Sequence, residues 1–483
     1  MNIFREVLLV SAASLALVGV AQAADLPTSK PAPPPPPTLA SCATPMEFIT
    51  TACPLTYYGI TLYGAVDMGG GWQSHGTPFN SSIISGVEEL VSKNSNHAGW
   101  LPAPGGLTQS FIGLKGKEEF APGWSFVFDL TMGFDPYSMT LANGPKSYLE
   151  NNGLPATLQS SNADSSRAGQ FYNGTGYAGV SNPTFGTLTF GRQNSLTLDG
   201  VIAYDPMGAS YAFSPIGYSG LTAGAGDTED ARYTTAIKYR VDAGMFRAAG
   251  LYQFGGYELN NATQGAYELQ VGGDFDGGAY GKLSLDAIYT RDKDAVSSAP
   301  LTAAQNLVHP GTLAATISDD TSVMLLAKYT YNQVKLYSGY EHITFQNPSN
   351  PQLTSFTDIG GYTAVYTGVG GQINNVAYTT NRIMQIMWVG GRYAFTDTLD
   401  AGVAYYHYIQ NNYAGPASCA TFGSSSSHCA GTMDAVSFDV DWKFAKKFDV
   451  YAGLMFSEMN NGLANGYLYH TNIDPTAGIR FRF

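Results

Sequence analysis

Apolar and polar side chains alternate along this chain in repeated segments. From Trp124 to Phe134 every even-numbered position is large and apolar, and Asp129 lies at one of the odd positions. The segment from Val436 to Phe444 repeats the pattern, with polar residues at its odd-numbered positions. Because successive side chains of a strand point to opposite faces of a sheet, each segment predicts a β-strand with one apolar and one polar face.

The end of the chain shows which solvent each face meets. Ala477, Ile479, Phe481 and Phe483 share one face of the last predicted strand, and two arginines, at 480 and 482, share the other. A register shift of one residue would turn both arginines toward hydrocarbon, at a cost of roughly 2–4 kcal/mol for each one near the middle of a bilayer. We therefore expect a strand that faces lipid on its apolar side and water on its polar side.

The pattern recurs sixteen times, with connections of unequal length. Ala121-Pro122 and Ala445-Lys446 are short, whereas 292–320, 347–381 and 412–432 are long. Tight turns at one end and long loops at the other are typical of a transmembrane barrel and not of a soluble sandwich. We predict an all-β fold, a transmembrane antiparallel β-barrel of 16 strands. The expected strands are residues 58–72, 109–120, 123–135, 168–181, 186–194, 231–241, 244–255, 265–275, 279–291, 321–331, 334–346, 382–395, 398–411, 433–444, 447–459 and 474–483.

The first residues are typical of a secretory signal peptide. Arg5 precedes the apolar stretch 7–21, and Ala21-Gln22-Ala23 forms a small-x-small cleavage site. A retained transmembrane helix would need about 18–20 apolar residues, and serines and a glycine interrupt this shorter run. We assign residues 1–23 to the signal peptide and expect export. An exported chain without a spanning helix can enter a membrane only as a closed barrel.

A proline-rich leader separates the signal from the barrel. Residues 24–57 contain five consecutive prolines at 33–37, which favour an extended polyproline segment. An even number of strands places this leader and the C-terminus on the periplasmic side. The leader is either a solvated spacer or a tether to the cell wall or a periplasmic partner. The barrel domain then spans residues 58–483.

Composition is consistent with a barrel that has a wet interior. Charged residues make up only 13% of the chain, which also holds 56 glycines and 32 tyrosines, as expected for many strands with polar inner faces and tyrosines at the membrane interfaces. Barrels of about 16–18 strands leave an aqueous channel. The formal net charge of −13 argues against a nucleic-acid partner and mildly favours cations in a pore.

Nothing in the sequence indicates a catalytic, metal or cofactor site. The four cysteines form two close pairs, Cys42 with Cys53 and Cys419 with Cys429, which an oxidising periplasm would allow to close as two disulfides. Neither pair has the C-x-x-C spacing of a zinc site, and the seven histidines are scattered. No serine lies in a G-x-S-x-G context. We therefore expect no enzyme, no metal and no cofactor.

Several motifs together resemble the trimeric general porins of Gram-negative outer membranes. Leu62-Tyr63-Gly64, Ile112-Gly113-Leu114-Lys115-Gly116, the run 185–193 and the terminal Phe483 carry this resemblance in order along most of the barrel. The resemblance implies an outer-membrane homotrimer surrounded by lipid, through which ions and small hydrophilic solutes diffuse passively.

The same resemblance implies that the segment after the fifth strand, 194–230, folds into the barrel as a constriction loop. It carries Asp199 and Asp205 and no lysine or arginine. In the family such acidic residues face arginines on the wall. The arginines expected to line the constriction here are Arg167, Arg192, Arg232 and Arg240, the last on the same strand face as Arg232 by parity. A further family arginine is replaced by Phe111.

The predicted function is therefore an open diffusion pore, with three alternatives. The first is a solute-selective porin. A row of exposed aromatic side chains leading to the constriction would support it, and the candidates are Tyr204, Tyr211, Phe213 and Tyr218. The second is an outer-membrane barrel enzyme. The third is a structural anchor, suggested only by the proline-rich leader.

Overall fold

A computed structural model describes most of the chain from Ser41 onward. The chain divides into two units, 1–40 and 41–483, and the first, with the predicted signal peptide and proline run, lies outside the described residues. Among the residues described, no helix is long and apolar enough to cross a membrane. The described residues are 41–75, 98–137, 139, 141, 152–155, 171–216, 232–254, 265–299, 301, 303–310, 312, 314–349, 358–359, 362–363, 373–413, 429–464 and 469–483.

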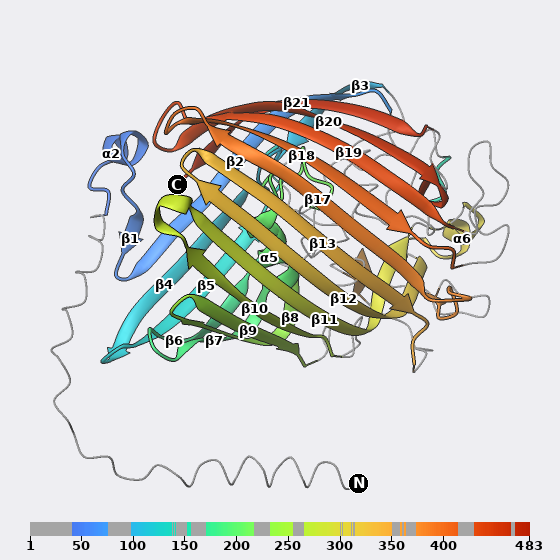
Figure 1. Cartoon of the computed structure of the whole chain (residues 1–483), viewed down its shortest axis with the longest axis horizontal. Helices are drawn as coiled ribbons and strands as arrows, with labels where there is room; N and C mark the ends of the chain where they lie inside the picture. The colour runs from blue at the N-terminus through green and yellow to red at the C-terminus, as the bar shows by residue number, and fades with distance from the viewer. Residues whose placement is uncertain are drawn as a thin grey trace, which may run out of the picture. The chain divides into compact units, whose positions relative to one another are not determined.

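Nineteen strands form one sheet that closes on itself (Figure 1). Three of them are short pieces beside longer ones, and the remaining sixteen form an antiparallel barrel in which β2 pairs with β21. The barrel strands are β2 (Ile60–Gln73), β4 (Phe111–Ala121), β5 (Trp124–Gly133), β6 (Gly176–Asn182), β7 (Gly186–Asn194), β8 (Arg232–Ala243), β9 (Phe246–Gln253), β10 (Tyr267–Asp276), β11 (Lys282–Ala299), β12 (Ala314–Tyr331), β13 (Val334–Gln346), β17 (Arg382–Ala394), β18 (Leu399–Gln410), β19 (Gly431–Trp442), β20 (Phe448–Asn461) and β21 (Thr471–Arg482).

The other elements are short. Strands β1 (Leu55–Tyr57) and β3 (Gly99–Pro104) pair with β2, and β16 (Ile373–Asn374) pairs with β12. A separate hairpin joins β14 (Asp358–Ile359) and β15 (Tyr362–Thr363). The α-helices are α2 (Pro45–Thr50), α5 (Leu196–Tyr204) and α6 (Ala303–Val308), and 3₁₀ turns η3 (Gly278–Tyr280) and η4 (Gly462–Ala464) follow β10 and β20.

All sixteen predicted strands are present, but one predicted loop is largely strand. The segment 292–320 was expected to be a long connection, whereas β11 and β12 continue their pairing as far as Ala299 and Ala314. A register irregularity lies between Asp292 and Ala295. Residues such as Thr316 and Ile317 are β-branched, and antiparallel pairing of such residues extends the hairpin beyond the predicted ends.

The predicted assignment of faces is confirmed. Phe126, Val436 and Ile479 are exposed on the outer surface, whereas Ser437 and Asp439 are buried inside. Apolar side chains cover the middle of the outer face: Leu269, Val323, Val389, Val403, Phe438 and Ile473. Exposed aromatic residues gather near the short turns: Phe120, Phe185, Tyr239, Phe246, Tyr393 and Trp442. This outer surface has the apolar band and aromatic girdle of a membrane barrel.

The interior is less polar than the sequence indicated. The inner faces of β12, β13 and β17 to β20 carry buried apolar side chains: Met324, Ile343, Ile386, Trp388, Tyr406, Met433 and Met455. Polar inner faces were expected for many strands, and this part of the wall departs from that expectation. The physical reason is that a segment of the chain packs against it, and two surfaces that exclude water from each other are apolar.

A disulfide-closed segment precedes the barrel and packs on the chain's other end. Cys42 and Cys53 form the predicted disulfide, which encloses α2. The Phe48 ring contacts the rings of Phe481 and Phe483 edge-on at 6.0 and 6.4 Å between centroids. We name residues 41–57 the N-terminal clasp. Its position next to the terminal strand is visible on the left of Figure 1.

The second predicted cysteine pair is described in part. Cys429 is buried and disulfide-bonded. Cys419, its predicted partner, lies outside the described residues.

Candidate functional site

The chain between β7 and β8 enters the barrel. We name its described part, residues 195–216, the inner segment. It begins with α5, whose N-cap Ser195 accepts a hydrogen bond from the Leu198 amide. Glu268, buried on the inner face of β10, accepts hydrogen bonds from the Leu196 amide at 2.5 Å and the Thr197 hydroxyl at 3.1 Å. A carboxylate that accepts from the free amides of a helix N-terminus holds that end of the helix in place.

Close packing holds α5 against the wall formed by β9 to β13. Leu196, Leu198 and Val201 are buried in this contact. A Cβ atom at Gly200 would come within 2.8 Å of the Cδ1 atoms of Ile288 and Leu326. Glycine at this position therefore allows the helix to touch β11 and β12 directly.

After α5 the inner segment crosses β17, β18 and β19. The Trp388 indole donates to the Tyr204 carbonyl at 3.1 Å, and the Arg392 guanidinium donates to the Pro206 carbonyl at 3.1 Å. Arg392 also pairs with Asp439, 2.9 Å away. These bonds come from buried or half-buried wall residues, so they fix the backbone of the inner segment to the barrel.

The far end of the inner segment reaches the opposite side of the barrel. The Ala212 amide donates to the Gly106 carbonyl at 2.9 Å, and the Tyr211 hydroxyl donates to the Gln109 side chain at 3.1 Å. Both acceptors lie in the connection between β3 and β4. Asp67 of β2 holds that connection by accepting from the amides of residues 107 and 108, both at 2.9 Å. The inner segment thus spans the interior from β10 to the neighbourhood of β2.

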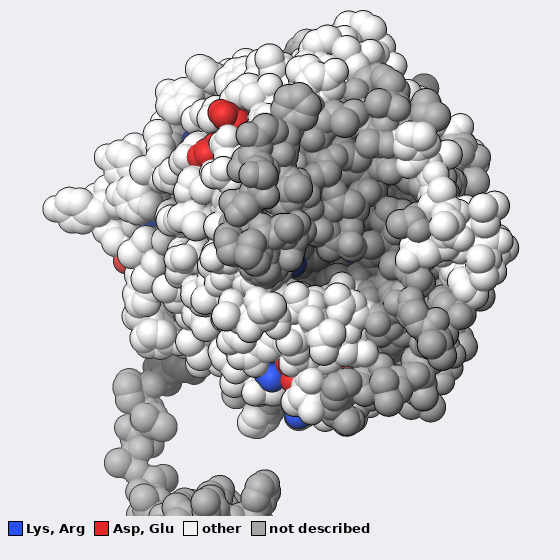
Figure 2. Space-filling model, turned by 90° about the vertical axis from the view of Figure 1, so that its right-hand side faces the viewer, with Lys and Arg blue, Asp and Glu red and all other residues white. Residues whose placement is uncertain are grey.

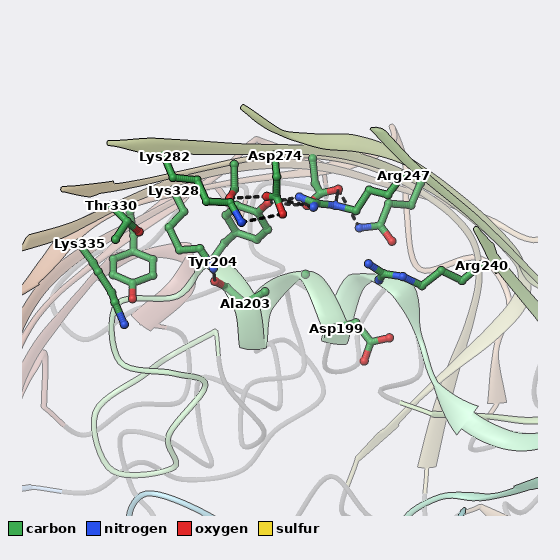
Figure 3. A pocket seen from close by; sticks show the side chains of 15 residues that line it. Asp199, Ala203, Tyr204, Arg240, Arg247, Asp274, Lys282, Lys328, Thr330 and Lys335 are labelled. Atoms are coloured by element: carbon green, nitrogen blue, oxygen red, sulfur yellow. Dashed lines mark hydrogen bonds and ion pairs between the residues drawn. The ribbon is translucent and has the colours of Figure 1, made fainter. Parts of the chain in front are cut away.

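A cavity of about 410 Å³ remains beside α5, between the helix and the wall (Figure 3). Five cationic and three acidic side chains line it together with several hydroxyl groups. The charged residues are Arg240, Arg247, Lys282, Lys328 and Lys335, and Asp199, Asp274 and Asp286. The end of the barrel with the long connections has a recess near its centre, and few charged side chains are drawn among the described atoms there (Figure 2).

The structure places the two predicted loop acids differently. Asp199 lies on α5 at the edge of the cavity, where it pairs with Lys238 at 2.5 Å and accepts from the Asn194 amide group at 3.0 Å. Asp205 ends α5 and is buried, accepting from the Tyr406 hydroxyl at 2.6 Å and the Ala209 amide at 2.7 Å. Burial raises the pKa of the Asp205 carboxyl. Asp205 therefore orders the backbone of the inner segment and does not line the cavity.

The predicted arginines do not form one cluster. Arg240 lines the cavity and pairs with Asp242 at 3.2 Å. Arg192 donates to the carbonyl groups of residues 173, 174 and 232, which lie at strand ends. Arg232 is buried at the start of β8. Arg167 lies outside the described residues.

The expectation that Arg232 and Arg240 share one face is wrong. The pairing of β7 with β8 shifts register between Gly191 and Gln193, and Thr235 has a positive φ of 49°. Tyr233 and Lys238 both bond to partners on the inner side of the wall, although they lie five positions apart and an odd separation should place them on opposite faces. A bulge of this kind reverses the alternation of inward and outward side chains along a strand, so counting odd and even positions across it does not predict which residues share a face.

Sequence reasoning missed four cations of the cavity. Arg247, Lys282, Lys328 and Lys335 lie on inner faces of β9, β11, β12 and β13, near the short turns. The alternation of side chains along each strand already places each of these four cations inside the barrel, so the sequence contained the information needed to find them. What the sequence did not show is that α5 lies over this part of the wall.

The described residues contain no group of three or more histidine, cysteine, aspartate or glutamate side chains that could hold a metal ion.

Comparison with known proteins identifies the family. The model of the Gram-negative porin family matches residues 10–462. No curated protein matches the chain. Among solved structures, an anion-selective porin from Comamonas acidovorans superposes with a TM-score of 0.54 at 15% identity, covering 88% of this chain and 99% of that one. OmpT, an outer membrane protein of Vibrio cholerae, gives a TM-score of 0.51 at 15% identity, with 89% and 99% covered. The trimer form of OmpT gives a TM-score of 0.51 at 16% identity, covering 88% of this chain and 99% of that one.

These structural likenesses show the fold, and the family match shows the class. The predicted barrel of sixteen strands, its outward apolar band and its family resemblance are all confirmed. The chain belongs to the Gram-negative porin family and is an outer-membrane channel for the passive diffusion of solutes.

Proposed function

We propose that the inner segment is the constriction of this channel and that solutes pass along the exposed side of α5. The observation that supports this is the cavity between α5 and the wall, in which Ala203 of the helix is exposed. The segment is bound to β10, to β17 and to the connection before β4. A loop tied at three places narrows the lumen without closing the barrel. The family and the fold are those of a channel, and we propose solute passage as the activity in place of catalysis.

Anions are favoured over cations at this constriction. Of the cavity's acids, Asp286 accepts from Arg247 and Tyr204, and Asp274 pairs with Arg247 and Lys282. The remaining cations therefore set the sign of the local potential, which attracts anions. The net charge of −13 belongs to the whole chain and does not describe the constriction. The likeness to an anion-selective porin agrees with this sign, although at 15% identity it carries no weight of its own.

We also propose a homotrimer embedded in outer-membrane lipid. Trimeric forms occur among the solved porins that share this fold. The exposed apolar band of the barrel supplies the surface for lipid and for neighbouring subunits.

A planar-bilayer experiment tests these proposals together. Purified protein in a KCl gradient should show ohmic conductance in groups of three steps, and a reversal potential of the sign that chloride permeation produces. Heat-denatured protein is the control. Folded protein without conductance would contradict the channel reading, and a potential of the opposite sign would contradict the anion preference.

A solute-selective porin remains the second candidate, but the aromatic row that would support it is absent from the described cavity lining. Tyr204 lines the cavity, whereas Tyr211 and Phe213 are buried in the packing of the inner segment. Tyr218 lies outside the described residues. No described feature favours an enzyme or an anchor.

A further inference from the structure

One end of the cavity concentrates positive charge around a hydroxyl group. Thr330 on β12 stands opposite Lys282 on β11 and opposite Lys335 on β13. Lys328 lies two residues before Thr330, on the same face of the strand. Directly paired and diagonal neighbours on one face of a sheet lie within about 5–8 Å of each other. Three lysines and one threonine are therefore neighbours on the inner face of the wall. Figure 3 shows their side chains beside α5, with the Lys282 ammonium group directed toward Asp274 and that of Lys328 toward Ala203.

Acids of the protein neutralise this group of lysines only in part. Lys282 pairs with Asp274 at 3.0 Å, and that carboxylate also binds Arg247 and the Ser284 hydroxyl. Lys328 donates to the Ala203 carbonyl at 3.0 Å and forms no ion pair within the described part of the chain. Lys335 likewise has no carboxylate within ion-pair distance among the described residues. We name Lys282, Lys328 and Lys335 with Thr330 the lysine cluster.

Holding like charges together on one sheet face is unfavourable unless an anion joins them. The lysine cluster faces a cavity of about 410 Å³, which is large enough for an organic solute and not only for a halide ion. Hydroxyl groups that accept or donate hydrogen bonds surround it, including those of Tyr204, Tyr337 and Thr330. Phosphate and paired carboxylates match this set, because they accept several charge-assisted hydrogen bonds at once.

We propose that the lysine cluster is a binding subsite for small organic solutes that carry a phosphate group or two carboxylates. This proposal rests on the proposed passage beside α5 and goes beyond a general preference for anions. A solute of this class binds transiently at the cluster as it passes, so its passage saturates, whereas chloride only follows the potential. Binding and release at one site in a pore raise the local concentration of the preferred solute.

Current block by glucose 6-phosphate tests the subsite, with glucose as the uncharged control. In about 0.1 M KCl, where screening is moderate, glucose 6-phosphate should block the wild-type channel saturably at millimolar concentration, and glucose should not. The variant K328Q/K335Q should raise the half-blocking concentration at least tenfold. K117Q, which removes a lysine from the inner face of β4, should leave it unchanged.

Each outcome separates this proposal from the proposed function. A conducting, anion-preferring channel without saturable block would overturn the subsite and leave the function intact. Equal block in the wild type and in K328Q/K335Q would also overturn it. Loss of block in K117Q as well would mean that total lumen charge, and not the cluster, is responsible. The single variant K335Q, at an exposed position, provides a folded test should the double variant fail to assemble.

Discussion

Replacing Glu268 tests how the inner segment is held. Glu268 is fully buried on β10 and its carboxylate accepts from the Leu196 amide, the Thr197 hydroxyl and the Thr290 hydroxyl. The first two donors belong to the N-terminal turn of α5. In the variant E268A this turn loses its acceptor while the rest of the wall keeps its composition.

The expected cost follows from the bonds that disappear. Hydrogen bonds to a charged group contribute about 1.5–3 kcal/mol, and a carboxylate at a helix N-terminus adds up to about 2 kcal/mol. Removing a buried carboxylate also removes its desolvation penalty, which offsets part of this gain. We expect a net loss of about 2 kcal/mol in the attachment of α5. Because about 1.4 kcal/mol corresponds to a factor of ten, the detached population should rise about thirtyfold.

Single-channel recording detects this change. A detached helix moves in the lumen, so E268A should show larger current noise and additional conductance levels, while heat-modifiable electrophoretic mobility remains that of a folded barrel. The matched control is E341A, which removes a buried glutamate on β13 that accepts from the Ser322 hydroxyl. Equal noise and conductance in the wild type, E268A and E341A would refute the assigned role of Glu268.

Three further predictions concern the wall, the clasp and the charges. R392A leaves the buried Asp439 without its cation, which should lower the free energy of unfolding by about 3 kcal/mol. The barrel should then unfold at a lower urea concentration, and an unchanged midpoint of urea unfolding would contradict this. C53S removes a disulfide that joins residues 11 positions apart, and it should destabilise the folded N-terminal clasp by about 2–3 kcal/mol. Limited proteolysis should then cleave the variant near Phe48 faster than the wild type, and equal cleavage rates would contradict a stabilising role of the disulfide. The anion preference should fall between 0.1 and 1 M KCl, because the Debye length falls from about 10 to about 3 Å, and a salt-independent permeability ratio would exclude exposed charges as its cause.

The strands were predictable because lipid and water impose their pattern residue by residue. Phe126 and Asp129 lie only three positions apart in sequence and face lipid and the barrel interior respectively, so a short stretch of sequence is enough to assign the faces. Arg480 lies inside and pairs with Asp449 at 2.9 Å, as the register of the last strand predicts. The extension of β11 and β12 was missed because pairing beyond the membrane is not marked by an apolar face.

The site was less predictable because it depends on contacts between distant parts of the chain. Asp205 resembled a pore acid in sequence, yet Tyr406, far along the chain, buries it. The bulge at Thr235 is a property of backbone conformation and has no clear sequence signal. Lys328 and Lys335 become a pair only through the register of β12 with β13.

The central claim is that solutes pass along the exposed side of α5, and thiol labelling tests it most directly. Ala203 is exposed at the cavity, Ala209 of the same segment is fully buried, and the cysteines of the described chain, at 42, 53 and 429, are disulfide-bonded. A negatively charged methanethiosulfonate reagent should lower the single-channel conductance of A203C within seconds and leave A209C and the wild type unchanged. Conductance of A203C that stays constant after verified labelling would contradict a passage beside α5.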